Sequence, residues 1–193
     1  MRKDIEFDAA GVTLRGWLYL PQGAPKPAPA VVMAHGFSAV KEQHLDRFAE
    51  VFAEAGLAAL VFDNRNFGAS DGTPRQEIDP LSQLRDYRHA VTFARTLPEV
   101  DRERIGAWGT SFSGGHVLVL GATDRRVSCV VAQAPVTGGA RDASRRARPD
   151  LAPAVPVRSV ADREARVMRE PPAMIAVVSS DSSASPALPG LEA

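Results

Sequence analysis

Residues 108–115 read Trp108-Gly109-Thr110-Ser111-Phe112-Ser113-Gly114-Gly115, and they lie between two apolar segments. The preceding segment, Arg104–Trp108, is typical of a buried strand, and the following one, Gly114–Ala122, is typical of a helix. A serine on such a tight strand-to-helix turn holds its hydroxyl above the edge of the sheet, and its neighbours must be small. The amides that open the helix favour developing negative charge. The segment therefore makes Ser111 a candidate nucleophile, with Gly109 as a supporting residue of the turn.

The segment departs from the usual pattern of such a turn at one position. The strict pattern is Gly-x-Ser-x-Gly, and Ser113 stands in place of the second glycine. Serine is small enough to be tolerated there. The alternative is an ordinary Gly/Ser turn in which Ser111 or Ser113 caps the helix. The turn alone favours neither interpretation.

A second loop favours catalysis. Ala30–Ala34 is a continuous apolar run, typical of a strand buried on both faces, and His35-Gly36-Phe37 follows it. Acyl transfer needs two preorganised donors for the oxyanion. The backbone amides of Phe37 and Phe112 are the natural pair, one from each loop. We assign His35 and Gly36 as supporting loop residues, with His35 a structural histidine bonded to nearby backbone.

Strands and helices alternate along the first part of the chain. Apolar runs and alternations predict strands at 5–7, 12–20, 30–34, 57–62, 104–108 and 127–133. Helical spacing of apolar residues predicts helices at 42–55, 79–97 and 114–122. Strands that alternate with helices of this length imply right-handed crossovers and a mostly parallel sheet with flanking helices. The predicted class is α/β.

Aromatic residues are confined to the first part of the chain. All eight Phe, two Trp and two Tyr lie at or before Phe112. Because large aromatic side chains supply much of the buried area of a core, residues 1–135 are predicted to form the core of the fold. Residues 136–193, rich in Ala, Arg, Pro and Ser, are predicted to form a partial cap or a poorly ordered tail.

The composition excludes several classes of function. The 193 residues carry 23 Lys plus Arg and 23 Asp plus Glu, so no net charge favours nucleic acid or an anionic membrane surface. Apolar runs are too short for a membrane helix or a signal peptide, so a cytoplasmic location is expected. A single cysteine, Cys129, excludes an internal disulfide and a Cys-based zinc site, and its apolar strand predicts a packed thiol. Phosphate-binding glycine fingerprints are absent, and we expect no cofactor and no metal.

Three segments in order resemble the α/β-hydrolase superfamily: Ala34–Phe37, Val61–Gly72 and Trp108–Gly115. Their spacing is similar to that of the dienelactone-hydrolase and acyl-peptidase-like branch, which includes bacterial esterases and thioester hydrolases. The resemblance covers roughly residues 5–135. It implies that Ser111 is the nucleophile and that the amides of Phe37 and Phe112 form the oxyanion hole.

The resemblance also implies a role for the middle segment, which would be the tight loop after the fourth strand. Its charged residues, Asp63, Arg65 and Asp71, are expected to pair with one another inside the loop rather than to act in catalysis.

The sequence does not supply the rest of a triad. In this fold the order is serine, acid, histidine, but the histidines are 35, 44, 89 and 116. A strand at Met174–Val178 would put Asp181 where the acid belongs, although its Pro-rich flanks favour a cap segment. We therefore expect a C-terminally truncated hydrolase fold that lacks its last strands and has little turnover.

The function expected from these features is a serine hydrolase of esterase or thioesterase type. Ser111 would attack a small-molecule acyl ester or thioester, and water would release the acyl-enzyme. The alternative is a non-catalytic, truncated α/β-hydrolase-like binding module. A partner chain that completes the sheet and supplies the histidine is a further expectation, because an open apolar edge favours association.

Overall fold

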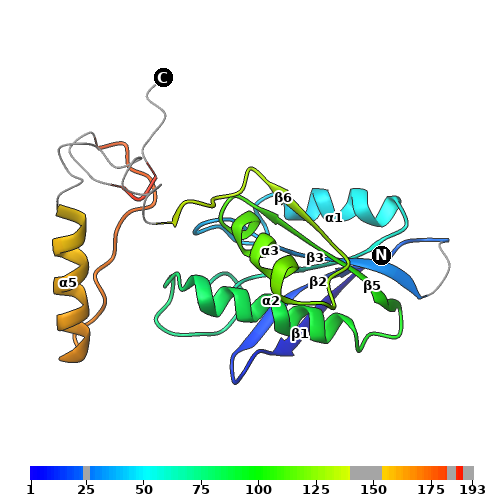
Figure 1. The fold of residues 1–193 in the computed structure, drawn as a ribbon, viewed down its shortest axis with the longest axis horizontal. Coiled ribbons are helices and arrows are strands. Elements are labelled where there is room, and N and C mark those ends of the chain that lie inside the picture. Colours follow the sequence, from blue (N-terminus) through cyan, green and yellow to red (C-terminus); the bar gives the residue numbers. More distant parts are fainter. Residues whose placement is uncertain (24–26, 140–153, 182–185, 189–193) are drawn as a thin grey trace. The chain divides into compact units, whose positions relative to one another are not determined.

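The computed structural model describes residues 1–23, 27–139, 154–181 and 186–188 (Figure 1). The chain divides into two compact units, Met1–Val136 and Thr137–Ala193. Every predicted site residue lies in the first unit.

A six-stranded mixed sheet forms the centre of the first unit, with the order β1-β2-β4-β3-β5-β6. Strands β1 and β2 are antiparallel to their neighbours, whereas β4, β3, β5 and β6 are parallel to one another. The predicted α/β class, with its mostly parallel sheet and flanking helices, is confirmed. The strands span Arg2–Asp8 (β1), Thr13–Tyr19 (β2), Ala28–Ala34 (β3), Ala58–Phe62 (β4), Val100–Thr110 (β5) and Cys129–Gln133 (β6).

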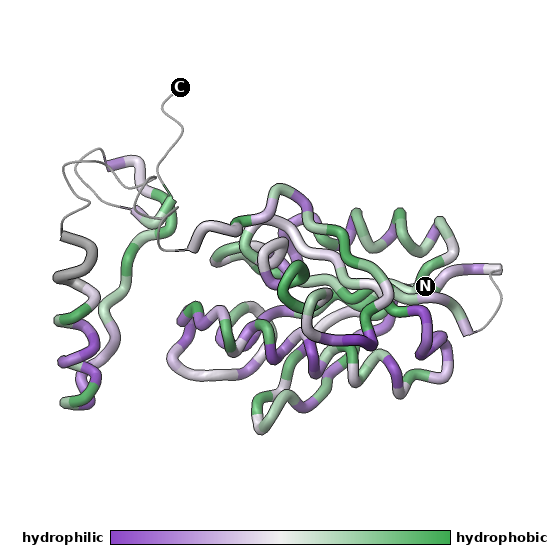
Figure 2. Tube along the Cα trace, viewed as in Figure 1, coloured by the Kyte–Doolittle hydropathy of each residue, from purple (hydrophilic) through white to green (hydrophobic). Residues whose placement is uncertain are grey.

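Helices cover both faces of the sheet (Figure 1). Helix α1 (Leu45–Glu54) packs on the face of the sheet that carries Met33 and Val61. Helices α2 (Pro80–Ala94) and α3 (Phe112–Thr123) pack on the opposite face, which carries the residues adjacent to Met33 and Val61 in β3 and β4. Successive residues of β3 and β4 therefore point into two separate cores, as expected for strands buried on both faces. Hydrophobic and hydrophilic residues alternate along α1 and α2, as surface helices require (Figure 2).

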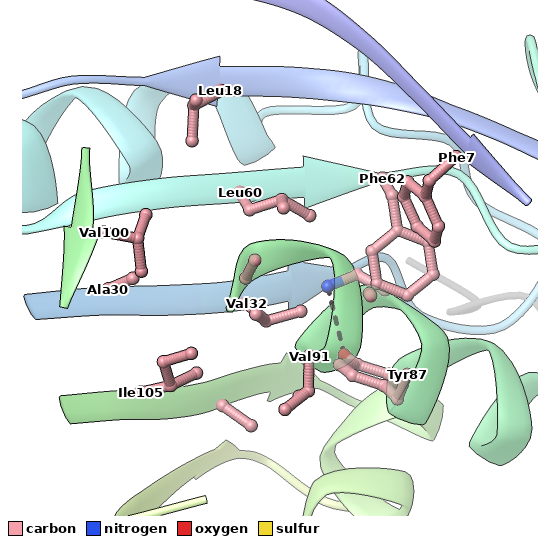
Figure 3. Close-up of a cluster of buried hydrophobic side chains, with 14 of the residues drawn as sticks. Phe7, Leu18, Ala30, Val32, Leu60, Phe62, Tyr87, Val91, Val100 and Ile105 are labelled. Atoms are coloured by element: carbon pink, nitrogen blue, oxygen red, sulfur yellow. Dashed lines mark hydrogen bonds between the residues drawn. The ribbon is translucent and has the colours of Figure 1, made fainter. Parts of the chain in front are cut away.

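Tyr87 of α2 lies at the centre of the larger core, against Phe62 and Val91 (Figure 3). The residue is fully buried. Its hydroxyl accepts a hydrogen bond from the Ala34 N–H and donates one to the Trp108 carbonyl, both at 3.0 Å. Ala34 ends β3 and Trp108 lies near the end of β5. The tyrosine thus joins the two strands that lead into the predicted catalytic loops.

The edge strand β6 is less buried than its sequence predicts. Val131 is 52% exposed, and the thiol of Cys129 is exposed as well. The expectation of a packed thiol is therefore wrong. The physical reason is that β6 is the last strand of the sheet and nothing among the described residues pairs with its outer edge.

The second unit contains helix α5 (Ala154–Val167), which the sequence analysis does not predict. Residues 174–178 form no strand, so the alternative that placed Asp181 at a strand end is not realised here. Instead, the carbonyls of Ala176 and Val177 accept hydrogen bonds from the N–H groups of Ala187 and Leu188. Across the described residues, no helix has the length and apolar character needed to cross a membrane.

Candidate active site

Ser111 occupies the turn between β5 and α3 in a strained backbone conformation. Its φ is 54° and its ψ is −112°, a region that costs a non-glycine residue on the order of 1–3 kcal/mol. The strand β6 helps to hold this conformation: the Ser111 N–H donates to the Gln133 carbonyl, and the Val136 N–H donates to the Ser111 carbonyl, each at 2.9 Å. The side chain makes no capping hydrogen bond with the helix. This geometry matches a nucleophile elbow and disfavours the helix-cap alternative for Ser111.

Glycines allow the backbone to approach closely around this turn. A Cβ on Gly109 would lie 2.3 Å from the Ser113 carbonyl oxygen, and a Cβ on Gly115 would lie 2.3 Å from the Val136 carbonyl oxygen. On the other loop, a Cβ on Gly36 would lie 3.2 Å from the Ser111 Cβ and 3.8 Å from its Oγ. The two loops predicted from the sequence therefore meet at Ser111.

The two residues predicted to form the oxyanion hole also lie together. The rings of Phe37 and Phe112 contact each other edge to face, with 5.7 Å between their centroids. Within the described ranges, neither backbone N–H donates a hydrogen bond. Two free amides beside a serine hydroxyl are what an oxyanion hole requires.

His35 orients the peptide that carries one of these amides. Its ring is buried, and Nε2 accepts a hydrogen bond of 3.1 Å from the Asn64 N–H. The proton therefore lies on Nδ1, which donates to the Gly36 carbonyl at 2.9 Å. Because this carbonyl and the Phe37 N–H belong to one planar peptide, holding the carbonyl fixes the direction of the N–H. Burial lowers the pKa of His35, which keeps the ring neutral in this arrangement.

Ser113 links the two loops directly. It is fully buried, and its hydroxyl donates a hydrogen bond to the His35 carbonyl. The departure from the usual glycine thus supplies a contact that glycine lacks. The sequence analysis missed this contact. The observation that could have indicated it is that Ser113 is polar at a position where the turn requires only a small residue.

The charged residues of the loop after β4 are paired, but not with one another. Asp63 pairs with Lys41 at 2.6 Å, and Asp71 pairs with Arg15 at 2.6 Å. Arg65 binds Asp86 of α2. The expectation of pairs inside the loop is wrong, because Lys41, Arg15 and Asp86 on three other segments lie within ion-pair distance of the charges of this loop.

Within the described part of the chain, no hydrogen bond joins a histidine ring to Ser111. His116 is buried against the Phe112 ring, with 4.9 Å between the centroids, and neither ring nitrogen has a hydrogen-bond partner. Burial lowers the pKa of His116 to about 4. His44 is exposed and His89 is half-buried.

Metal chemistry has no visible site in the described ranges, where no three His, Cys, Asp or Glu side chains gather to hold an ion.

Comparison with known protein families assigns this chain to one of them. The model of the Peptidase S15 family, described as X-Pro dipeptidyl-peptidase, matches residues 10–174. This chain belongs to the S15 family. The α/β-hydrolase resemblance predicted from the three segments is thereby confirmed at the level of the superfamily.

Among the relatives of this S15-family chain is a thiohydrolase from Eupenicillium brefeldianum, 42% identical over 178 residues, which cover 92% of this chain and 55% of the relative. The quorum-quenching protein AidA from Acinetobacter baumannii is 45% identical over 136 residues, which cover 70% of this chain and 44% of the relative. The crystal structure of the α/β hydrolase GrgF from Penicillium sp. sh18 superposes with a TM-score of 0.81 at 34% identity, covering 97% of this chain and 62% of that one. The chain thus spans about half the length of the curated relatives it matches.

Proposed function

We propose that this S15-family chain carries the nucleophile and oxyanion hole of an acyl hydrolase that acts on a small ester or thioester. The observation that carries the proposal is the strained Ser111 backbone directly beside Gly36, with the free amides of Phe37 and Phe112 next in sequence to these two residues. An accidental turn gives no reason for a serine to be held in a costly conformation next to two unused donors.

The proposed reaction has two steps. The Ser111 Oγ forms a bond to the acyl carbon, the amides of Phe37 and Phe112 stabilise the oxyanion, and the alcohol or thiol leaves with the serine proton. Water then adds to the same carbon, its proton returns to Ser111, and the carboxylic acid leaves. His35 and Ser113 support the oxyanion hole by holding its two loops, and they do not touch the substrate.

The names of the relatives support acyl chemistry. They include thiohydrolases, a quorum-quenching protein and an acyltransferase. The family description names an X-Pro dipeptidyl-peptidase instead. Both chemistries use the same elbow and oxyanion hole, and the neutral Phe37 and Phe112 rings favour an apolar acyl group over a charged peptide amino terminus.

We further propose that Ser111 is only weakly activated within these 193 residues. A serine hydroxyl needs a base to take its proton, and no histidine of this sequence follows position 116. An oxyanion hole by itself can retain ~10³-fold catalysis over water. We therefore expect slow single-turnover reaction with activated substrates, and a base from outside these residues, in the same chain or a partner, for full turnover.

A fluorophosphonate probe tests the nucleophile. The parent chain, Ser111→Ala and Ser113→Ala are incubated with the probe, and intact masses are measured by mass spectrometry; circular dichroism shows that each variant is folded. We expect one adduct on the parent, none on Ser111→Ala, and a slower adduct on Ser113→Ala. Release of p-nitrophenol from short acyl esters is then compared with release of p-nitroaniline from an Ala-Pro anilide.

A folded parent chain that takes no adduct would defeat the nucleophile proposal and leave the binding-module alternative. Faster cleavage of the Ala-Pro anilide than of the esters would instead assign peptidase chemistry to Ser111.

A further inference from the structure

Lys41 is a buried cation in the loop that carries Phe37. The residue is 3% exposed, and its Nζ lies 2.6 Å from Asp63 and 2.7 Å from Glu42. The ammonium also lies 5.0 Å from the centre of the Trp17 ring, within the range of a cation–π contact. Burial opposes the charged form, but the hydrogen bonds with Asp63 and Glu42 outweigh it and raise the pKa of Lys41.

Asp63 joins this loop to the loop that follows β4. Its fully buried carboxylate accepts a hydrogen bond of 2.7 Å from the Lys41 N–H and one of 2.9 Å from the Ala69 N–H, in addition to the Lys41 ammonium. A Cβ on Gly68 would lie 2.2 Å from the carboxylate, so the second loop closes directly over it. A single carboxylate therefore holds both loops.

The loop that carries Phe37 is consequently held on both sides of its amide. On one side the His35 ring binds the Gly36 carbonyl. On the other side, four residues beyond Phe37, both the backbone and the side chain of Lys41 bind Asp63. We propose that Lys41 is a positioning residue: its ion pair with Asp63 fixes the far end of this loop and thereby aims the Phe37 N–H at the oxyanion.

An ion pair suits positioning better than it suits stability. Removing two charges from water is costly, and well-packed apolar residues often stabilise a protein as much or more. The pair differs from apolar packing because few geometries satisfy both the ammonium and the carboxylate. Because an aimed amide matters only where an oxyanion forms, the inference rests on the function proposed above.

The experiment uses the full chain and three variants. Lys41→Met removes the charge, Lys41→Arg keeps it, and Arg126→Met is the matched control, because it breaks the 2.6 Å pair with Asp124 beyond the other end of α3. Fluorophosphonate labelling is followed at several probe concentrations, which gives a maximal rate and a half-saturating concentration. Hydrogen exchange of the amides at 36–40 is measured by mass spectrometry in the same samples.

We expect the folded fraction of Lys41→Met to label roughly ten- to a hundredfold more slowly at saturation, because one misaligned oxyanion donor has an effect on that order. The half-saturating concentration should stay within about twofold, as for an interaction made in the transition state. Lys41→Arg should restore most of the rate, and amides 36–40 should exchange faster in Lys41→Met. If Lys41→Met does not fold, the double variant Lys41→Met with Asp63→Leu, which leaves neither member of the buried pair as an unpaired charge, takes its place.

The outcomes separate this inference from the proposed function. Labelling of Lys41→Met at the parent's maximal rate overturns the positioning role, and so does equal slowing in Arg126→Met. If the parent takes no label, the proposed function fails, and the role of Lys41 in aiming an oxyanion donor fails with it. If the parent takes the label but the amides at 36–40 exchange equally fast in Lys41→Met and in the parent, the inference alone is overturned.

Discussion

The Ser113 hydroxyl donates a hydrogen bond to the His35 carbonyl, across 78 residues of sequence. Both partners are buried. The carbonyl belongs to the residue whose ring orients the Gly36–Phe37 peptide, and the hydroxyl lies two residues after Ser111. This hydrogen bond therefore couples the position of the proposed nucleophile, Ser111, to the direction of one of the two proposed oxyanion donors.

Replacing Ser113 tests this coupling. We expect Ser113→Gly, which restores the usual motif, to lower the free energy of unfolding by about 1–3 kcal/mol, because a buried carbonyl loses its partner. It should also slow fluorophosphonate labelling. Urea unfolding gives the first quantity. Ser128→Ala is the matched control, because the Ser128 hydroxyl also binds a backbone carbonyl, at 3.2 Å, but is exposed; its unfolding free energy should change by less than about 0.5 kcal/mol.

The Tyr87 hydroxyl should also contribute to the free energy of unfolding, because it binds two buried backbone groups in the core. Tyr87→Phe leaves the Ala34 N–H and the Trp108 carbonyl buried without a partner, and we expect a loss of roughly 2–4 kcal/mol, one desolvated group at each strand. Burial raises the pKa of Tyr87, so ionisation plays no part below pH 10. Tyr19→Phe, whose hydroxyl is near Arg2 at the edge of the smaller core, should cost clearly less. Equal losses in the two variants would show that the bridge between β3 and β5 is unimportant.

His116 predicts a dependence of stability on pH. Its pKa is about 4 in the folded state and 6.5 when exposed, so between these values the unfolded chain binds the extra proton. Stability is therefore fully present above pH 6.5 and falls as the pH drops towards 4, by about 3 kcal/mol in total. Thermal unfolding between pH 4 and 7 should show a shallower slope in His116→Leu than in the parent. His44→Gln, at an exposed histidine, should keep the parent's slope.

The open edge of β6 predicts self-association. Val131 is 52% exposed on the last strand of the sheet, and an unpaired apolar edge invites pairing with another chain. We expect the apparent mass in sedimentation velocity to rise with concentration, and Val131→Lys to reduce this rise. Val119→Lys, at a similarly exposed residue on α3, is the comparison: if it has the same effect, general surface hydrophobicity rather than the strand edge drives association.

Much of the first unit follows from local sequence patterns. The apolar runs at 30–34 and 57–62 become β3 and β4 because only strands buried on both faces tolerate uninterrupted apolar residues. The helix predicted from residue 42 begins only at Leu45, because the Lys41 side chain binds Asp63 and His44 takes a left-handed backbone conformation. Such a tertiary contact leaves no trace in the spacing of apolar residues.

Part of the candidate site was also predictable from local sequence patterns. Gly109, Ser111 and the His35–Phe37 loop carry signals in their residue types, and the structure brings them together. The partners of Asp63, Arg65 and Asp71 carry no such signal, because opposite charges on several segments are equally good partners until the sheet order is known. Helix α5 was missed because the Ala-, Arg- and Pro-rich composition of residues 136–193 favours a cap or a tail over regular structure.

The pairing of β3 with β5, the two strands that the Tyr87 hydroxyl joins, also has a consequence for the rate of folding. Ser111 and Gly36 come into contact only after β3 and β5, which lie on either side of β4 and α2 in the sequence, have paired in parallel. Such non-local parallel pairing is among the slower events in chain collapse. The reactivity of Ser111 is therefore a reporter of refolding: after dilution from urea, the probe should attach only once the β3–β5 pairing is complete, later than the recovery of helical circular dichroism.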